Sequence, residues 1–466
     1  MSKLANMVGW IDDRFPLTKV WNEHLAQYYA PKNFNFWYYF GSLAILMLVN
    51  QILTGIWLTM NYKPDAATAF ASVEYIMRDV DWGWLIRYMH STGASFFFIV
   101  VYLHMFRAML YGSYKKPREL IWIIGMLILL VLMAEAFAGY LLPWGQMSYW
   151  GAQVIISLFG AIPGVGDALV EFIRGDYSIS DITLNRFFAL HVIVLPLALI
   201  GLIFVHIVAL HHVGSNNPDG IEIKKNKGPD GVPVDGVAFH PYHTSKDLVA
   251  IVVFLMIFTS VVFFAPEMGG YFLEHANFEP ANVSATPEHI APVWYFTPYY
   301  SILRAVPDKF WGFVLFALAV ILPMFLPWLD RSRVRSIRYR GWMYKTALSV
   351  FVVSFVMLGW LGLQPAEIGL APGSLGMTLC QVPIVVSVAA TEALAAWAEE
   401  ADEGDTYRAP LEKAIRYIET AQNPGAGWRY GVRPGDSDTS VTYWMLSALD
   451  RAREAGALIV NHPQAL

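Results

Sequence analysis

Charge and cysteine are both scarce in this sequence. Only 15% of its 466 residues are charged, and Cys380 is the single cysteine. One cysteine excludes an intrachain disulfide and a metal cluster held by thiolates of this chain alone. The net charge of −5 disfavours a nucleic-acid partner, because such proteins usually present a basic surface. The polar segment 1–14 lacks the apolar core of a secretory signal, so no cleavable signal peptide is expected.

Apolar residues are abundant instead, at 56% of the chain, and the mean hydropathy is +0.43. A helix needs about 20 apolar residues to cross a membrane. Seven runs meet this requirement and contain at most one charged residue: 34–62, 88–106, 120–145, 187–210, 248–265, 310–329 and 346–365. An eighth uncharged run, 368–391, is rich in Gly and Pro, and both a span and a soluble loop remain open for it. The sequence therefore predicts an all-α membrane bundle of seven or eight helices.

The charges in the loops predict how the spans are oriented. Loops after the second, fourth and sixth runs are rich in Lys and Arg, whereas the loops between them are acidic. Positively charged loops favour the cytoplasmic side, so we expect a cytoplasmic N-terminus. The two long acidic-side loops, 142–186 and 266–309, are of a length that is usually functional. We expect them to form short helices lying over the outer face.

Four histidines lie inside two of the predicted spans. His90 and His104 are 14 residues apart in the second run, and His191 and His206 are 15 apart in the fourth. The first pair falls on one helix face with a separation of about 21 Å. The second pair does so too if Pro196 kinks its helix and absorbs the extra residue. Opposed histidines on two helices can supply both axial ligands of a haem iron. We therefore expect His90 to meet His191 near the outer face, and His104 to meet His206 near the inner face.

Glycine spacing supports this interpretation. Gly41 and Gly55 in the first run, and Gly125 and Gly139 in the third, are again 14 residues apart. Glycine lets a helix backbone approach a flat group closely. The alternative is that these small residues only serve helix packing.

Two arginines flank the first histidine pair. Arg87 precedes His90 by one turn, and Arg107 follows His104 by one turn. Each could bind a haem propionate through charge-assisted hydrogen bonds. The alternative is an arginine that reaches the membrane interface for solvation.

Four motifs accompany these features: GYLLPWGQMSYWGA at 139–152, GSNNPDG at 214–220, FHPYHTSKD at 239–247 and PVWY at 292–295. With the histidines and glycines, they resemble the cytochrome b subunit of the cytochrome bc complex, quinol–cytochrome c reductase, in its bacterial single-chain form. The resemblance implies two non-covalent haem b groups held by the four histidines, and a membrane homodimer with a Rieske iron–sulfur protein and cytochrome c1. It also implies location in the lipid of the bacterial inner membrane.

The reaction implied by this resemblance is a proton-translocating Q cycle. Ubiquinol is oxidised at an outer site, and electrons pass through the two haems to reduce ubiquinone at an inner site. Two alternatives of other classes remain, namely a dihaem membrane anchor of another quinone-linked oxidoreductase and a transporter with intramembrane histidines. The anchor would need neither segment 292–295 nor the last three spans.

The resemblance implies the residues of both quinone sites. At the inner site these are Ser42, His211, Lys246 and Asp247. A histidine and a carboxylate suit the proton uptake that accompanies quinone reduction. The alternative for the Lys–Asp pair is an exposed helix start.

At the outer site the implied residues are Tyr140, Pro292, Trp294, Tyr295 and Tyr300. The family motif is Pro-Glu-Trp-Tyr, and Val293 stands here in place of its glutamate. Glu135 lies inside the third run, where a carboxylate is costly and usually functional. We hypothesise that it takes over part of the proton release; the alternative is a carboxylate packed against a neighbouring helix or subunit.

The resemblance ends after Gly362. The Ala- and Glu-rich tail resembles one helical repeat of the squalene-cyclase and prenyltransferase toroids, and because one repeat cannot close a toroid, no catalysis is expected there. An eighth span would place this tail in the cytoplasm; without one, the tail would lie on the outer face.

The sequence predicts six domains. They are a cytoplasmic segment 1–33, a dihaem four-helix bundle 34–213, a cytoplasmic loop 214–245, helices with the quinol-site loop 246–366, the candidate eighth helix 367–391 and the soluble tail 392–466.

Overall fold

The computed structural model describes residues 3–22 and 28–364. The candidate eighth helix, Cys380 and the tail therefore lie outside the described residues. Within them, seven helices are long and apolar enough to cross a membrane, as predicted. They are built on α3 (Phe40–Thr59), α5 (Gly83–Tyr111), α6 (Glu119–Leu141), α10 (Leu195–Val213), α11 (Thr244–Phe264), α13 (Lys309–Ile321) and α15 (Trp342–Leu363).

Short segments extend several of these spans. They are η2 (Phe36–Tyr38) before α3, α9 (Asp181–Ala189) and η4 (Leu190–Val194) before α10, η6 (Phe239–His243) before α11, and η9 (Leu322–Phe325) with α14 (Leu326–Leu329) after α13. The remaining elements are α1 (Lys3–Asp12), α2 (Leu17–Trp21), α4 (Ala69–Arg78), α7 (Gln146–Leu158), η3 (Phe159–Ala161), α8 (Gly166–Arg174), η5 (Ile223–Lys225), η7 (Met268–Gly270), η8 (His275–Phe278) and α12 (Thr297–Ala305).

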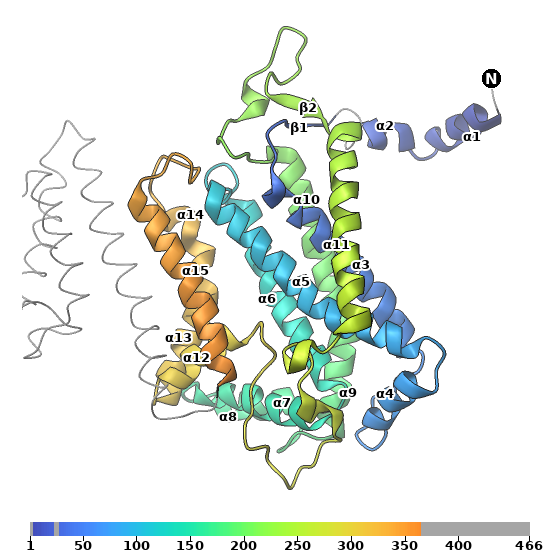
Figure 1. Ribbon diagram of the computed structural model, residues 1–466, viewed down its shortest axis with the longest axis vertical. Helices are drawn as coiled ribbons and strands as arrows, with labels where there is room; N and C mark the ends of the chain where they lie inside the picture. The colour runs from blue at the N-terminus through green and yellow to red at the C-terminus, as the bar shows by residue number, and fades with distance from the viewer. Residues whose placement is uncertain (1–2, 23–27, 365–466) are drawn as a thin grey trace, which may run out of the picture. The chain divides into compact units, whose positions relative to one another are not determined.

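The short elements gather at the two ends of the bundle. Figure 1 shows α4, α7 and α8 together at one end, which we call the outer end after the loop charges. The antiparallel strands β1 (Tyr29–Pro31) and β2 (Gly236–Ala238) lie at the opposite, inner end (Figure 1). The expectation that both long loops contain short helices is confirmed by α7, α8 and α12.

The fourth span takes up its extra residue differently from the expected kink at Pro196. The turn η4 is a π-helix of five residues that contains His191 and ends two residues before Pro196. Proline has no N–H to donate, so the helix cannot keep its regular bonding pattern just before it. A π-turn inserts one residue without breaking the helix, which explains how a 15-residue spacing is accommodated here.

Helix pairing places the predicted histidine helices beside the predicted glycine helices. Helix α5 packs closely against α3, and α10 packs closely against α6. Phe97, Phe98 and Val101 on α5 share one core with Met126 and Leu129 on α6, which joins the two pairs. The four helices thus bring two histidine-bearing and two glycine-bearing faces together.

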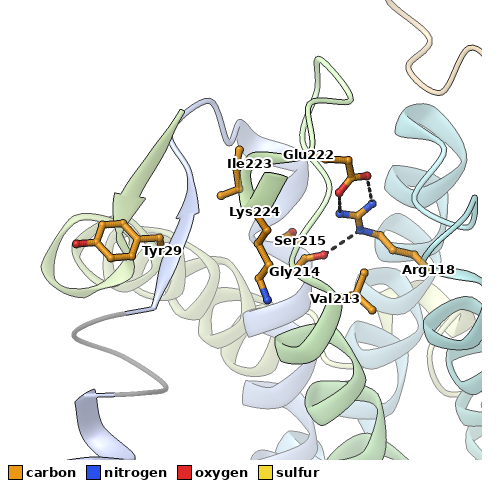
Figure 2. Close-up of a pocket in the computed structure, with 8 residues that line it drawn as sticks. All are labelled: Tyr29, Arg118, Val213, Gly214, Ser215, Glu222, Ile223 and Lys224. Carbon is orange, nitrogen blue, oxygen red and sulfur yellow. Dashed lines mark hydrogen bonds and ion pairs between the residues drawn. The ribbon is translucent and has the colours of Figure 1, made fainter. Parts of the chain in front are cut away.

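A buried ion cluster connects three loops at the inner end. Arg118, whose side chain is 4% exposed, donates to both carboxylate oxygens of Glu222 at 2.7 and 2.8 Å, and to the Gly214 carbonyl at 2.9 Å (Figure 2). Arg335 also binds the Glu222 carboxylate. Burial alone raises the pKa of Glu222, but the hydrogen bonds and charges of the two arginines lower it overall. The cluster therefore holds an ionised carboxylate between two guanidinium groups.

Removing this carboxylate is expected to destabilise the protein. Glu222→Ala leaves two arginines without their anion, one of them almost fully buried, which costs about 3 kcal/mol. We expect a clearly lower thermal midpoint of the purified protein in detergent, followed by tryptophan fluorescence. The matched control is Glu74→Ala, because Glu74 pairs with an Arg78 side chain that is 73% exposed and such pairs contribute about 0.5 kcal/mol. Equal midpoints for the two variants would contradict a stabilising role of the cluster.

Candidate functional site

The structure brings the four span histidines together in two pairs. The ring centroids of His90 and His191 are 6.0 Å apart, and those of His104 and His206 are 6.4 Å apart. Bonds of about 2 Å from a metal to imidazole nitrogen place two opposed rings about 6 Å apart. The pairing predicted from helical spacing is therefore confirmed, and both separations suit two axial ligands of one iron.

Each of the four predicted glycines faces one of these histidines. A methyl group on the glycine would lie 3.2 to 3.4 Å from the Cε1 atom of the opposing ring in three cases: Gly55 with His90, Gly41 with His104 and Gly125 with His206. At Gly139 it would lie 2.7 Å from Nδ1 and 2.9 Å from Nε2 of His191, and closer still to Cε1. Because glycine has no side chain, each imidazole can pack directly against the backbone of the neighbouring helix.

The distances between these glycines and the opposing histidine rings differ, so alanine substitutions at the glycines should differ in their effect on haem content. Gly139→Ala is expected to displace the His191 ring, because the new methyl group would overlap three ring atoms. Gly125→Ala makes an identical change at 3.4 Å and requires only a small adjustment of His206. We expect a several-fold loss of outer haem in Gly139→Ala, measured from the reduced-minus-oxidised spectrum, and near-normal content in Gly125→Ala. Equal haem content in the two variants would show that the clearance does not matter.

The two histidines of the outer pair have hydrogen-bond partners at Nδ1. His90 Nδ1 lies 2.9 Å from Thr54 Oγ1, and the Thr54 hydroxyl in turn donates to the Asn50 carbonyl at 2.6 Å. His191 Nδ1 lies 3.0 Å from the Glu135 carbonyl and 3.1 Å from Glu135 Oε1. An acceptor at Nδ1 leaves the lone pair on Nε2, the ring nitrogen that would bind a metal.

The inner pair has different surroundings. His104 Nδ1 lies 3.4 Å from a terminal nitrogen of Arg107, whose guanidinium also stacks over the Tyr38 ring at 4.9 Å. Arg107 Nε is buried and has no hydrogen-bond partner among the described residues. An orphaned buried donor beside a histidine pair fits an acidic group of a bound haem, such as a propionate. Arg87 occupies the corresponding place one turn before His90 and is partly buried.

The PVWY segment packs against the part of α5 that lies between His90 and His104. The Tyr295 ring stacks on Phe98 with centroids 3.9 Å apart, and the Tyr295 carbonyl accepts from the Tyr102 hydroxyl at 2.8 Å. Trp294 Nε1 donates to Ser95 Oγ at 3.0 Å. Val293 is buried in the same core, so its side chain fills space and offers no proton-accepting group.

Three predicted outer-site residues remain, namely Tyr300, Pro292 and Tyr140. The Tyr300 hydroxyl donates to the Ile290 carbonyl at 3.0 Å, within the loop that leads into the motif. Pro292 occupies the position directly before Val293 in that loop. Tyr140, near the outer end of α6, donates through its hydroxyl to Glu274 Oε2 at 3.0 Å.

Glu274 is the functional candidate that sequence reasoning missed. Burial raises its pKa to about 7, although hydrogen bonds from its own backbone N–H and from the Tyr140 hydroxyl oppose the rise. Burial, reinforced by the charge of Glu274, also raises the pKa of Tyr295. The sequence contains no signal for this position, because Glu274 is one of several acidic residues in a loop without periodicity.

Backbone pairing between the two long loops holds Glu274 in place. Gln146 N donates to the Glu279 carbonyl at 2.9 Å, and Ala281 N donates to the Trp144 carbonyl at 3.0 Å. Asn277 Oδ1 accepts from Ser148 N at 2.8 Å. These bonds fasten the segment that follows Glu274 to the segment that follows Tyr140.

The predicted inner-site residues come from three helices at the inner end. His211 stacks on Tyr28, with centroids 4.5 Å apart and ring planes 19° apart. Lys246, in the first turn of α11 beside Asp247, donates to the Tyr242 hydroxyl at 2.9 Å. Ser42, in the first turn of α3, donates to the Tyr39 carbonyl at 2.9 Å.

Tyr28 connects two of these helices. Its ring lies between His211, near the end of α10, and Phe239, which precedes α11, at 6.2 Å from the latter. Lys224 caps the end of α10 by donating to the carbonyls of His211 and His212 at 2.8 and 2.9 Å. Lys224 also lines the small hollow drawn in Figure 2, together with Tyr29 and Arg118.

Comparisons with known proteins identify relatives of this chain. The family model described as cytochrome b/b6/petB matches residues 25–214, and the model described as cytochrome b(C-terminal)/b6/petD matches residues 280–379. The chain is 66% identical to cytochrome b of Allochromatium vinosum over 368 residues, which are 77% of this chain and 89% of that protein. It is 51% identical to cytochrome b of Rhodospirillum rubrum, over 77% of this chain and 85% of that protein.

A solved structure resembles the fold as well. A chain of a hyperthermophilic respiratory Complex III superposes with a TM-score of 0.75 at 40% sequence identity. The superposition covers 82% of this chain and 97% of the other.

Proposed function

Because this chain belongs to the cytochrome b family, we propose that it holds two b-type haems and connects an outer quinol site with an inner quinone site. It is a multi-pass membrane protein and the cytochrome b subunit of a bc complex, an oxidoreductase of several subunits. The proposed reaction is the oxidation of ubiquinol and the reduction of cytochrome c, coupled to proton translocation. The proposed partners are a Rieske iron–sulfur protein, cytochrome c1 and a second copy of this chain in a bacterial inner membrane, with the N-terminus cytoplasmic.

The two histidine pairs are the observation that carries this proposal. His90 with His191, and His104 with His206, are at separations that suit bis-histidine ligation at two depths of one helix bundle. Bound there, haem supplies reversible one-electron transfer. Of the flanking arginines, Arg107 is proposed to pair with a propionate, because its buried Nε has no hydrogen-bond partner among the described residues.

The outer site of this proposal is formed by the PVWY segment and the paired loops. Quinol oxidation releases protons, and a proton acceptor works best when its pKa is near the working pH. Val293 cannot accept a proton, whereas the pKa of Glu274 is about 7 and its carboxylate accepts from the Tyr140 hydroxyl. We assign proton acceptance to Glu274 for these reasons, whereas the Glu135 carboxylate contacts His191.

The proposed inner site uses groups that can hold a quinone and deliver protons. His211, Lys246 and Asp247 lie near helix ends at the inner end of the bundle, where Tyr28 joins their two segments. A histidine, an ammonium group and a carboxylate can hydrogen-bond the quinone oxygens and pass protons to them. Ser42 offers a hydroxyl from α3.

The test is made on the complex purified from its native membrane. A reduced-minus-oxidised spectrum is expected to show b-type haem, and quinol–cytochrome c reductase activity is expected to be blocked by both antimycin- and stigmatellin-type inhibitors. Absence of b-type haem would overturn the proposal. Haem without inhibitor-sensitive activity would favour the membrane-anchor alternative.

A further inference from the structure

The carboxylate of Glu135 meets the outer histidine pair inside the helix bundle. Its Oε1 lies 3.1 Å from His191 Nδ1, and its own backbone carbonyl lies 3.0 Å from the same nitrogen. The Glu135 side chain is 16% exposed and that of His191 is 17% exposed. Glu135 Oε2 is buried and has no hydrogen-bond partner among the described residues. A carboxylate that gives up solvation in this way is costly to place in a membrane and calls for a functional reason.

The chemistry of a metal-bound imidazole supplies such a reason. When Nε2 binds a metal, Nδ1–H donates to its acceptor, and a charged acceptor makes the imidazole a more electron-rich ligand. Hydrogen bonds to a charged oxygen are about twice as strong as those to a neutral one. An electron-rich ligand and a nearby negative charge both stabilise the more positive, oxidised state of the iron.

An arginine lies one turn from a histidine in both pairs, Arg87 at His90 and Arg107 at His104, but the carboxylate of Glu135 is found only at the outer pair. There it meets His191, while His90 meets the neutral Thr54 hydroxyl. The inner pair has the cationic Arg107 within 3.4 Å of His104, and no ion pair links either inner histidine to a carboxylate in the described part of the chain. A cation beside a haem favours its reduced state, as an anion favours its oxidised state.

We propose that Glu135 is a positioning residue that lowers the reduction potential of the outer haem by accepting the Nδ1–H hydrogen bond of His191. The inference rests on the proposed function, since it requires haem at the outer pair. A lower potential makes the outer haem the weaker electron acceptor. Electron transfer from the outer to the inner haem is then favourable, so the carboxylate influences the direction of electron flow. Proton acceptance at the quinol site remains with Glu274.

The test is a spectroelectrochemical titration of both b haems in the purified complex at one pH. Glu135→Gln keeps the shape of the side chain and an oxygen acceptor but removes the charge. We expect the ratio of reduced to oxidised outer haem at a set potential to rise at least tenfold, which is 59 mV for one electron. The inner haem, measured in the same titration, is expected to keep its midpoint.

Glu119→Gln is the matched control, because Glu119 lies on the same helix about 24 Å away. This variant is expected to change neither midpoint. An outer midpoint in Glu135→Gln equal to that of the parent complex, with both haems present, would overturn the role of Glu135. A parent complex without b-type haem would instead overturn the proposed function itself.

A second variant covers the case in which Glu135→Gln assembles without outer haem. Glu135→Asp retains the charge but is one methylene shorter, so the carboxylate withdraws from His191 Nδ1. We expect a smaller rise of the outer midpoint than that of a neutral side chain, with an unchanged inner midpoint. No change of the outer midpoint in this variant would equally reject the proposal.

Discussion

The His191→Leu variant is expected to lose the outer haem and with it nearly all quinol–cytochrome c turnover. The physical reason is that leucine has no lone pair for a metal, and His90 alone would leave one axial position without its ligand. The inner pair lies about 21 Å farther along α5, too far to replace the outer pair as the first electron acceptor. The reduced-minus-oxidised b-type absorbance of the purified complex should fall to about half.

The control for this variant is His212→Leu, on the same helix α10. His212 is exposed and contributes its carbonyl, not its ring, to the contact with Lys224. We expect full haem content and near-normal turnover in this control. Retention of both haem signals in His191→Leu would contradict the assignment of His191 as a ligand.

The Glu274→Gln variant is expected to lower quinol oxidation by about 100-fold at pH 8. In the parent complex the pKa of Glu274, raised to about 7 by burial, leaves the carboxyl protonated at pH 6 and ionised at pH 8. Only the ionised form can accept a proton, so parent turnover should rise with pH through about 7. Glutamine cannot ionise, so the variant should be slow and lack this rise.

Two further variants test whether the pH dependence comes from Glu274 itself. Glu279→Gln changes an exposed carboxylate of the same loop and should leave the profile unchanged. Tyr140→Phe removes a hydrogen bond that lowers the pKa of Glu274, so the rise should move to higher pH. A Glu274→Gln variant that keeps the rise near pH 7 would contradict the role of this carboxylate.

Much of the fold and of the paired histidines follows from short-range physics. Apolar length predicts each span, and a rotation of about 100° per residue predicts which side chains share a face. His90, His104, Gly41 and Gly55 could therefore be placed relative to one another before any tertiary contact was known. Their partners on α6 and α10 follow from the same periodicity.

The carboxylates could not be assigned in this way. Glu135 and Glu274 are 139 positions apart in sequence, and which of them reaches the proposed quinol site depends on how two irregular loops pair through their backbones. No periodic pattern encodes that pairing. That Glu135 serves proton release stays a prediction; in the structure Glu135 contacts His191, and Glu274 contacts Tyr140.

The π-turn η4 has a consequence for the phase relation between α5 and α10. The histidines of α5 are 14 residues apart and those of α10 are 15 apart, yet both pairs close to nearly equal separations. The wide turn consumes the additional residue, so both helices complete about four revolutions between their two histidines. If one residue were deleted from η4, the histidines of the two helices would still face each other only if the turn reverted to ordinary α-helix. If the turn did not revert, the deletion would rotate His191 by about 100° about the helix axis, and His90 would no longer face a histidine.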